Sequence, residues 1–463
     1  WWHASVWLVG ATGWLFVSLH TYGGLPAWLA VIAVAMLCLA LSGYMGVAGW
    51  AWARVSAGRP GADALVFGGG WLLAELARAE IFTGFPWGAS GYALMDSPWK
   101  ALAPWVGVYG SGALWAGALA WAVWALQMAP SRASARAWGP AFAVGALVGL
   151  LAMVGGGHFT RPLGQPLSVS LIQGNVPQNE KFTPEAQWPN LVWHAHALVD
   201  APGQLIVAPE TAFTLLPQQL PEGFWGEFET AFADRPGRVA LVGMPLGDEK
   251  SGYANAVIGL TDRPSGSPGA TYRYAKHHLV PFGEFIPWGF RWFVDLMNMP
   301  LGDFSRGPLV APSILVQGQR VAPTICYEDL YGEEIAARFT EPARAPTVLV
   351  NVSNLAWFGE HVAIHQHLQI ARTRSMEFQV PTVRATNTGA TVVIDAQGRV
   401  THALPPNTQG VLQAQVQGHA GVTPYAWWAG RLSLWPLWAI GVGLWALGAW
   451  RRRRLDGTSP HIH

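Results

Sequence analysis

Long apolar stretches fill the first third of the chain, and one more lies close to its carboxyl end. A helix needs about 20 mostly apolar residues to cross the hydrocarbon core of a bilayer. Several stretches meet this length, and we predict membrane-spanning helices at 4–22, 27–53, 63–82, 101–127, 138–156 and 427–449. The pattern therefore predicts a membrane α-helical bundle.

The segment between the last two stretches has a different pattern. Residues 361–379 have the apolar spacing of a helix. The other apolar runs are short and rich in β-branched residues, which predicts strands. Their ranges are 167–178, 203–210, 238–245, 253–260, 319–326, 346–354, 380–387 and 390–400, and a Gly turn should join the last two as a hairpin. Strands that are apolar on both faces indicate sheets covered by helices, so we predict an α/β sandwich.

Composition agrees with a membrane protein that carries a large soluble part. Hydrophobic residues make up 51% of the chain and charged residues only 12%, roughly half the charged share of a soluble domain. The net charge of +1 gives no reason to expect nucleic acid as a partner. The third stretch contains Glu75 and Arg78, which at this spacing can pair on one helix face.

Basic residues predict the orientation in the membrane, because cytoplasmic loops carry an excess of Lys and Arg. Arg54 and Arg59 follow the second stretch, Arg132 and Arg136 follow the fourth, and 451–454 follow the last. These segments should be cytoplasmic, and the soluble region should face the opposite side. We predict a helical bundle over 1–157, a soluble domain over 158–425, and a last helix with a basic tail over 426–463. The start at WWHAS, without Met, suggests that further spans precede residue 1.

Two cysteines occur in the chain. Cys38 lies within an apolar stretch, where a small packing residue is the ordinary interpretation. Cys326, in APTICYEDL, lies at the end of a predicted strand. A thiol becomes a useful nucleophile when a base or a cation is near it. Two other strand ends carry such groups: Glu210 in VAPET, and Lys276 in YAKHHLVPFGEF.

The order of these three residues resembles the Glu–Lys–Cys triad of the nitrilase superfamily. The chain is most similar to its membrane-bound branch, the apolipoprotein N-acyltransferases, and the resemblance covers nearly the whole sequence. It depends on QGNVPQ, PET, YAKHHLVPFGEFIP, FSRGP, ICYED, NVSNLAWFGE, HQHLQIARTRSMEFQVPTVRATNTG and GVTPYAWWAG, and on TYGGLP and IFTGFPWG in the membrane half. The resemblance implies an αββα nitrilase-like domain. Phe182 and Asn354 depart from the residues that many relatives have, Trp and Asp.

The resemblance also implies roles for individual residues. Glu210 would be the general base, Lys276 would stabilise the tetrahedral intermediate, and Cys326 would form the thioester. The further site residues are an accessory carboxylate at Glu284, Tyr327 and Glu328 around the nucleophile, with the N–H of Tyr327 as an oxyanion donor, and Trp357 in the substrate pocket. No cofactor is implied, and no metal: the histidines 361, 365 and 367 lack a fitting Cys or carboxylate ligand.

The implied reaction moves a fatty acyl chain from a phospholipid to the amine of a diacylglyceryl cysteine at the start of a lipoprotein. The enzyme would lie in a bacterial inner membrane with its catalytic domain in the periplasm. Three alternatives stay open: a membrane-tethered amidase that hydrolyses its thioester with water, a transporter with a binding domain, and a scaffold without activity. The apolar segment 290–302 could be a lid over a lipid entry or an ordinary packed loop.

Overall fold

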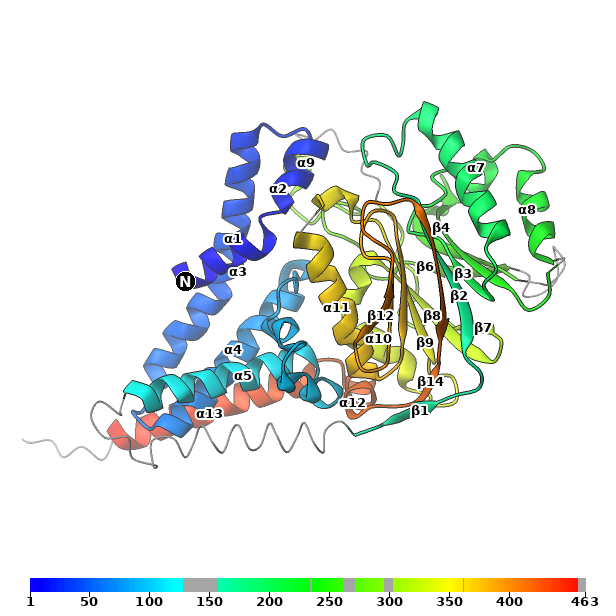
Figure 1. Ribbon diagram of the computed structural model, residues 1–463. Coiled ribbons are helices and arrows are strands. Elements are labelled where there is room, and N and C mark those ends of the chain that lie inside the picture. The colour runs from blue at the N-terminus through cyan, green and yellow to red at the C-terminus, as the bar shows by residue number, and fades with distance from the viewer. Residues whose placement is uncertain (128–156, 234, 262–270, 295–302, 361, 457–463) are drawn as a thin grey trace, which may run out of the picture. The chain divides into compact units, whose positions relative to one another are not determined.

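A computed structural model describes residues 1–127, 157–233, 235–261, 271–294, 303–360 and 362–456 (Figure 1). Its contacts divide the chain into two units. The helical unit comprises residues 1–13, 32–158 and 431–463, and the sandwich unit comprises 14–31 and 159–430. The short segment 14–31 thus joins the second unit although it lies among the predicted spans.

The helical unit is made of long apolar helices. Two helical stretches of the described chain, Ala27–Val55 and Pro98–Ala125, are long and apolar enough to cross a membrane; two broken pairs would bring the number to four. The helices are α1 (Trp2–Thr12), α3 (Ala27–Val55), α4 (Pro60–Glu80), α5 (Ala103–Gln127) and α13 (Trp435–Asp456).

The structure corrects several of the predicted spans. The stretch 4–22 is interrupted after α1, and 427–449 is interrupted at Ser433, whose positive φ of 50° cannot continue a right-handed helix. The stretch 138–156 lies outside the described residues. On α4, Glu75 and Arg78 interact electrostatically, and both also contact the backbone: Arg78 donates to the carbonyls of Phe85 and Trp87, and Glu75 accepts from the N–H of Ser90.

The sandwich unit contains two six-stranded sheets and confirms the αββα prediction. One sheet has the order β13-β2-β3-β4-β5-β6 and the other β12-β11-β10-β9-β8-β7, and β1 pairs with β14 at the side. Their bounds are β1 Thr160–Pro162, β2 Leu167–Gln173, β3 Leu205–Val207, β4 Val239–Asp248, β5 Gly252–Leu260, β6 Thr271–Ala275, β7 Ile314–Val316, β8 Gln319–Ile325, β9 Val348–Ser353, β10 Thr382–Thr386, β11 Val392–Ile394, β12 Val400–Ala403, β13 Gly410–Val416 and β14 His419–Gly421.

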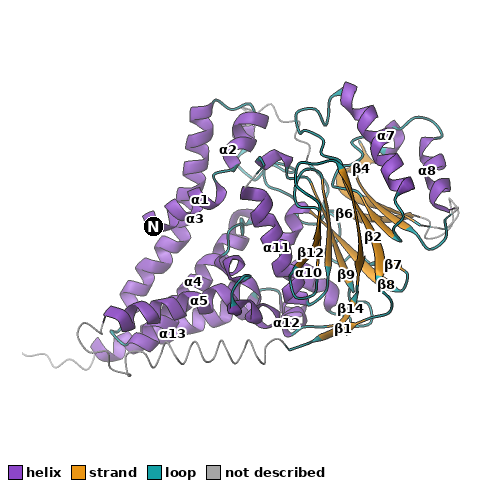
Figure 2. Cartoon of the chain, viewed as in Figure 1, coloured by secondary structure: helices purple, strands orange, loops and turns teal. Residues whose placement is uncertain are grey.

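Apolar side chains fill both faces of each sheet. The central core between the sheets joins Leu171 and Val257 of the first sheet to Val350 and Val383 of the second. On the outer face of the first sheet lie α7 (Pro184–Asp200) and α8 (Phe224–Ala233), and on that of the second lie α10 (Gly332–Ala336), α11 (Val362–Phe378) and α12 (Pro424–Leu432) (Figures 1 and 2). This two-sided burial explains why the central strands β3 and β9 are buried along their whole length.

Most of the predicted elements of this unit are present. All the predicted strands are found, β10 and β11 form the predicted antiparallel hairpin, and α11 matches the predicted helix to within a residue. In the segment 290–302, residues Arg291–Val294 form the short helix α9, and 295–302 lie outside the described residues. Trp292 in α9 and Trp288 before it are exposed, and the role of this segment as a lid stays a prediction.

Candidate active site

Cys326 begins a tight 3-10 turn directly after strand β8. Its φ is 48°, in the left-handed region that non-Gly residues rarely adopt and that clusters at functional sites. Its carbonyl accepts hydrogen bonds from His367 Nε2 at 3.1 Å and Asn351 Nδ2 at 3.4 Å. Arg384 donates to the other ring nitrogen of His367, which fixes the proton on Nε2. Buried side-chain donors on His367 and Asn351 thus stabilise the strained turn through the Cys326 carbonyl.

The structure brings Lys276 and two of the predicted glutamates together at the ends of strands β3 and β6. Lys276 Nζ lies 2.9 Å from Glu284 Oε1 and 3.4 Å from Glu210 Oε1. All three side chains are buried, and Lys276 has no measurable exposure. One ammonium therefore lies between two carboxylates in a site shielded from water, where charges act strongly.

Two asparagines that the sequence interpretation did not assign to the site hold the carboxylates in place. Asn255 Nδ2 donates to Glu210 Oε1 and to Glu284 Oε1, each at 2.7 Å. The backbone N–H of Asn354 donates to Glu210 Oε2 at 2.9 Å. The signal for Asn255 was present: a polar side chain inside the buried strand YANAVIGL requires a partner.

The charges around the thiol set its resting state. Burial raises the pKa of the Cys326 thiol, Glu210 raises it further, and Lys276 opposes both. Burial lowers the pKa of Lys276, but Glu284 and Glu210 together outweigh burial and leave it above its ordinary value. The resting site thus holds a neutral thiol beside a charged lysine, and the thiol must pass its proton to a base before it can attack.

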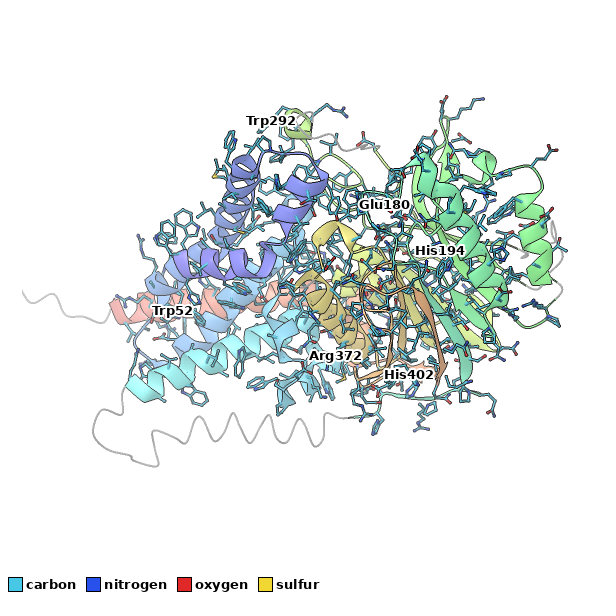
Figure 3. All side chains as sticks on the ribbon, turned by 45° about the horizontal axis from the view of Figure 1, so that its top comes forward. Trp52, Glu180, His194, Trp292, Arg372 and His402 are labelled. Atoms are coloured by element: carbon cyan, nitrogen blue, oxygen red, sulfur yellow. The ribbon has the colours of Figure 1, made fainter. Side chains whose placement is uncertain are left out.

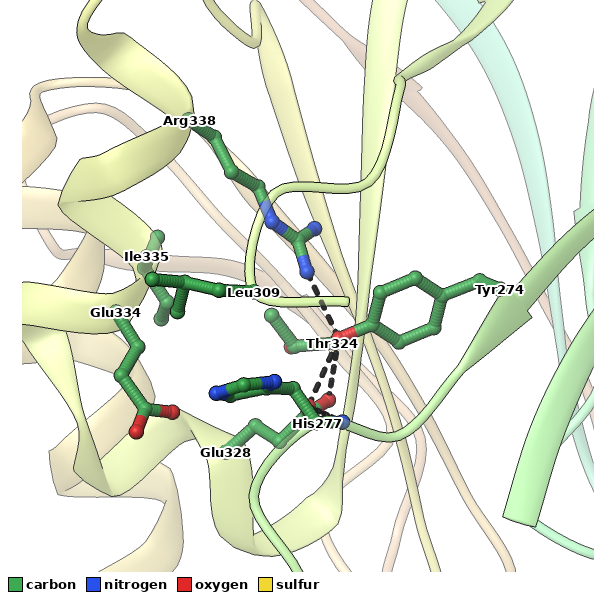
Figure 4. Close-up of a pocket in the computed structure, with 8 residues that line it drawn as sticks. All are labelled: Tyr274, His277, Leu309, Thr324, Glu328, Glu334, Ile335 and Arg338. Carbon is green, nitrogen blue, oxygen red and sulfur yellow. Dashed lines mark hydrogen bonds between the residues drawn. The ribbon is translucent and has the colours of Figure 1, made fainter. Parts of the chain in front are cut away.

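Glu328 has a different position from the other two glutamates. It accepts hydrogen bonds from the Tyr274 hydroxyl at 2.7 and 2.8 Å (Figure 4). It also accepts from the N–H of Ile325 at 2.6 Å and from the N–H of His277 at 2.7 Å. Arg338 donates to the same Tyr274 hydroxyl. The Glu328 carboxylate therefore connects the end of β8 to the segment that follows Lys276. Glu328 also lines a small polar pocket, together with Thr324, Glu334 and Leu309.

Tyr327 and Trp357 lie on two further loops of the sandwich unit. Tyr327 is buried in the turn after the nucleophile, with its ring against Tyr331. Trp357 lies in a short 3-10 turn, where its carbonyl accepts from Ser18 Oγ at 2.6 Å and its ring meets Tyr22 edge-on. The contacts of Trp357 thus run to residues 14–31, and its role toward substrate stays a prediction.

Comparisons with known proteins decide the family. The carbon-nitrogen hydrolase family model matches residues 168–425, and the model of the apolipoprotein N-acyltransferase N-terminal domain matches residues 1–118. The apolipoprotein N-acyltransferase of Verminephrobacter eiseniae is 47% identical over 98% of this chain and 87% of its own. The chain belongs to the apolipoprotein N-acyltransferase family. The Ralstonia nicotianae member is 43% identical over 98% of this chain and 84% of its own.

Membership of this family accounts for the two units of the chain. The protein is a membrane protein with several candidate spans, joined to a nitrilase-like α/β domain. Among solved structures, an amidase from Nesterenkonia sp. aligns with a TM-score of 0.41 at 17% identity, over 57% of this chain and 93% of the amidase. The nitrilase superfamily uses a Glu–Lys–Cys triad, and we predict that Glu210, Lys276 and Cys326 form it in this chain.

Proposed function

We propose that this protein transfers a fatty acyl chain from a phospholipid, through a thioester at Cys326, to the amine of a diacylglyceryl cysteine at the start of a lipoprotein. The observation that carries the proposal is the position of Lys276 between Glu210 and Glu284, and the electrostatic interaction of all three with the buried Cys326 thiol, which lies on a strained turn. Family membership supplies the reaction class. No step of this chemistry requires a metal or a cofactor.

In the first half-reaction, Glu210 takes the proton of Cys326 and the thiolate attacks the sn-1 ester carbonyl of the phospholipid. A tetrahedral oxyanion forms. The ammonium of Lys276 and the backbone N–H of Tyr327 stabilise it, as preorganised donors do in acyl transfer. The C–O bond of the ester then breaks, and the glycerol oxygen receives the proton from Glu210. A lysophospholipid leaves and the acyl chain remains on sulfur.

The second half-reaction returns the enzyme to its starting state. The α-amine of the acceptor attacks the thioester carbonyl, and Glu210 takes the proton that the amine loses. The C–S bond breaks, an amide forms, and the proton on Glu210 returns to the Cys326 thiolate. Asn255 keeps Glu210 and Glu284 in place through both halves, because it donates to both carboxylates. Tyr327, Glu328 and Trp357 shape the space around the acyl chain.

The location follows from the basic residues. Residues 1–157 form the membrane bundle, 158–425 the catalytic domain, and 426–463 the last helix with its cytoplasmic tail. The catalytic domain lies on the periplasmic side of a bacterial inner membrane, where the headgroups of both lipid substrates are within reach. The support is the positive-inside rule applied to Arg54, Arg59 and the basic tail.

Mass spectrometry tests the proposal. The purified protein is incubated with phosphatidylethanolamine in mixed micelles, and the peptide that contains Cys326 is weighed. We expect a mass gain of one acyl chain, its loss when a diacylglyceryl peptide is added, and a matching gain on that peptide. Cys326→Ala should show no gain. An unmodified Cys326 in the intact protein would overturn the proposal, and release of free fatty acid without an acylated peptide would favour the hydrolase alternative.

A further inference from the structure

A second lysine lies buried next to Glu210. Lys181, in the turn that precedes α7, is only 3% exposed. Its ammonium donates a hydrogen bond to the backbone carbonyl of Glu210 at 3.1 Å. Lysines are almost never fully buried unless they are paired, yet in the described part of the chain no carboxylate lies within ion-pair distance of Lys181. Burying this ammonium costs desolvation free energy, and that cost requires a compensating role.

The charge count of the site supplies that reason. Glu210 and Glu284 share one ammonium, that of Lys276, and Asn255 adds donors without charge. Counted by formal charge, two carboxylates and one ammonium leave one negative charge in a buried site, where such an excess is expensive.

The histidine beside Lys181 does not correct this excess. His194, on α7 and labelled in Figure 3, is neutral because burial, together with the charge of Lys181, lowers its pKa to about 4. Lys181 is thus the group close to Glu210 that can supply the missing positive charge.

We propose that Lys181 is a positioning residue of the catalytic centre, whose ammonium holds the Glu210 backbone and offsets the second carboxylate. The role rests on the proposed function, because it acts on the base that accepts the Cys326 proton. When that proton moves to Glu210, the negative charge moves to sulfur, and Lys181 keeps the ionised site neutral on both sides of the transfer. Lys181 directly precedes Phe182, and we assign the functional role of this turn to the lysine.

Burial of the Lys181 ammonium lowers the stability of the folded protein, a cost that functional sites often carry. Burial lowers the pKa of Lys181 to about 8, and only Glu210 acts to raise it. A lysine kept for packing alone would gain nothing from this position, because a methionine of similar length fills the same space without a buried charge.

Three substitutions separate the charge from the hydrogen bond. Lys181→Gln keeps a donor for the Glu210 carbonyl and removes the charge, Lys181→Met removes both, and Lys181→Arg keeps both. We expect the single-turnover rate of acyl-adduct formation at Cys326 to fall about 10- to 100-fold in the Gln and Met variants. The Arg variant should retain a larger share of the rate. Lys250→Gln, at an exposed turn, is the matched control and should acylate at the normal rate.

A pH profile gives a readout that a purely structural role would not move. The charged and titratable groups that face Glu210 are Lys276, Glu284, Cys326 and Lys181, and Asn255 and the N–H of Asn354 donate to its carboxylate. Lys181 interacts in turn with His194. Loss of a nearby cation makes a carboxylate hold its proton to higher pH. The low-pH decline of the acylation rate should therefore shift to higher pH in Lys181→Gln, and stay in place in Lys250→Gln.

The outcomes discriminate between this inference and the proposed function. If the unchanged protein forms no adduct, the proposed function fails. If it does form one, and Lys181→Gln has the same rate and the same pH profile, the role of the charge is overturned. A normal Gln variant with a slow Met variant would reduce Lys181 to a hydrogen-bond donor and also contradict the proposal. Should the Met variant not fold, the Gln variant, which keeps a donor in place, decides.

Discussion

Asn255 contacts both carboxylates of the site with a single side-chain nitrogen. Each hydrogen bond is 2.7 Å long, and the backbone carbonyl of the same residue accepts from the N–H of Lys276 at 2.8 Å. One residue of β5 thus sets the relative positions of Glu210, Glu284 and Lys276. Two carboxylates this close repel each other, and the amide reduces that repulsion by donating to both.

We therefore expect Asn255→Asp to be more harmful than Asn255→Leu. The Leu variant removes the donor, whereas the Asp variant adds a third carboxylate to a buried pair. A loss of kcat of about 100-fold for Leu, and a larger one for Asp, is the expected result. Asn407→Asp, at an exposed turn, serves as the control for added charge. Equal activity of the Asp and Asn forms would show that Asn255 does not govern the carboxylates.

His194 gives the stability of the sandwich unit a dependence on pH. An unfolded histidine binds its proton near pH 6.5, whereas burial lowers the pKa of folded His194 to about 4. Between these values the unfolded state binds more protons, so stability falls as the pH is lowered from 6.5 toward 4. His194→Gln should lose less stability on acidification, by about 2 to 3 kcal/mol.

Melting temperatures measured from pH 7 to pH 4.5 test the role of His194. The exposed His402→Gln is the matched control, and its melting curve should follow that of the unchanged protein. Parallel curves for all three proteins would contradict a neutral, buried His194.

At the scale of elements, the segment 14–31 packs against the loop that carries Glu284. Phe282 of that loop joins an apolar cluster with Leu25 and Ala30, which also contains Phe16, Leu19, Leu29 and Ile286. The backbone of Phe282 has a φ of 63°, a conformation that costs an aromatic residue free energy. The cluster compensates for this cost, and the loop is held two residues before its carboxylate.

This packing predicts that two substitutions at Phe282 differ in their effect on kcat. Phe282→Gly relieves the backbone but removes the ring, so the loop should loosen and kcat should fall about 10-fold or more. Phe282→Leu keeps an apolar anchor and should retain most of the activity. Gln317→Gly, at another residue with positive φ in an exposed turn, should leave kcat unchanged. A fully active Phe282→Gly would show that the cluster does not position Glu284.

The secondary-structure elements show which features of the fold and of the site the sequence could predict and which it could not. Apolar β-branched runs predicted the central strands because their burial comes from both sides and leaves an unbroken signal. The helix breaks after residue 12 and at Ser433 were missed, since apolar composition continues across them. The proposed triad was predicted from motifs at strand ends. Asn255 and Lys181 were not assigned, because their roles depend on partners far away in the sequence that only the fold brings near.

At the scale of the molecule, the helical unit places two basic segments at one end. Arg452 in the tail donates to the carbonyl of Ser56, which lies in the loop between Arg54 and Arg59. Both segments were predicted from their charge to be cytoplasmic, and this contact independently requires them to share a side. Basic residues near helix ends are retained on the cytoplasmic face, so this end of the helical unit is the one that should not be translocated.

Reporter fusions test that orientation. A fluorescent protein that matures only in the cytoplasm should fluoresce when fused after residue 463. Alkaline phosphatase, which is active only outside the cytoplasm, should be active when inserted at the exposed turn around Lys250 in the sandwich unit. Replacing 451–454 by Gln removes the charge that retains the tail and should lower the fluorescence, whereas the same change at the exposed Arg399 should not. The reverse pattern of the two reporters would place Cys326 on the cytoplasmic side, away from a periplasmic lipoprotein acceptor, and the proposed reaction could not proceed there.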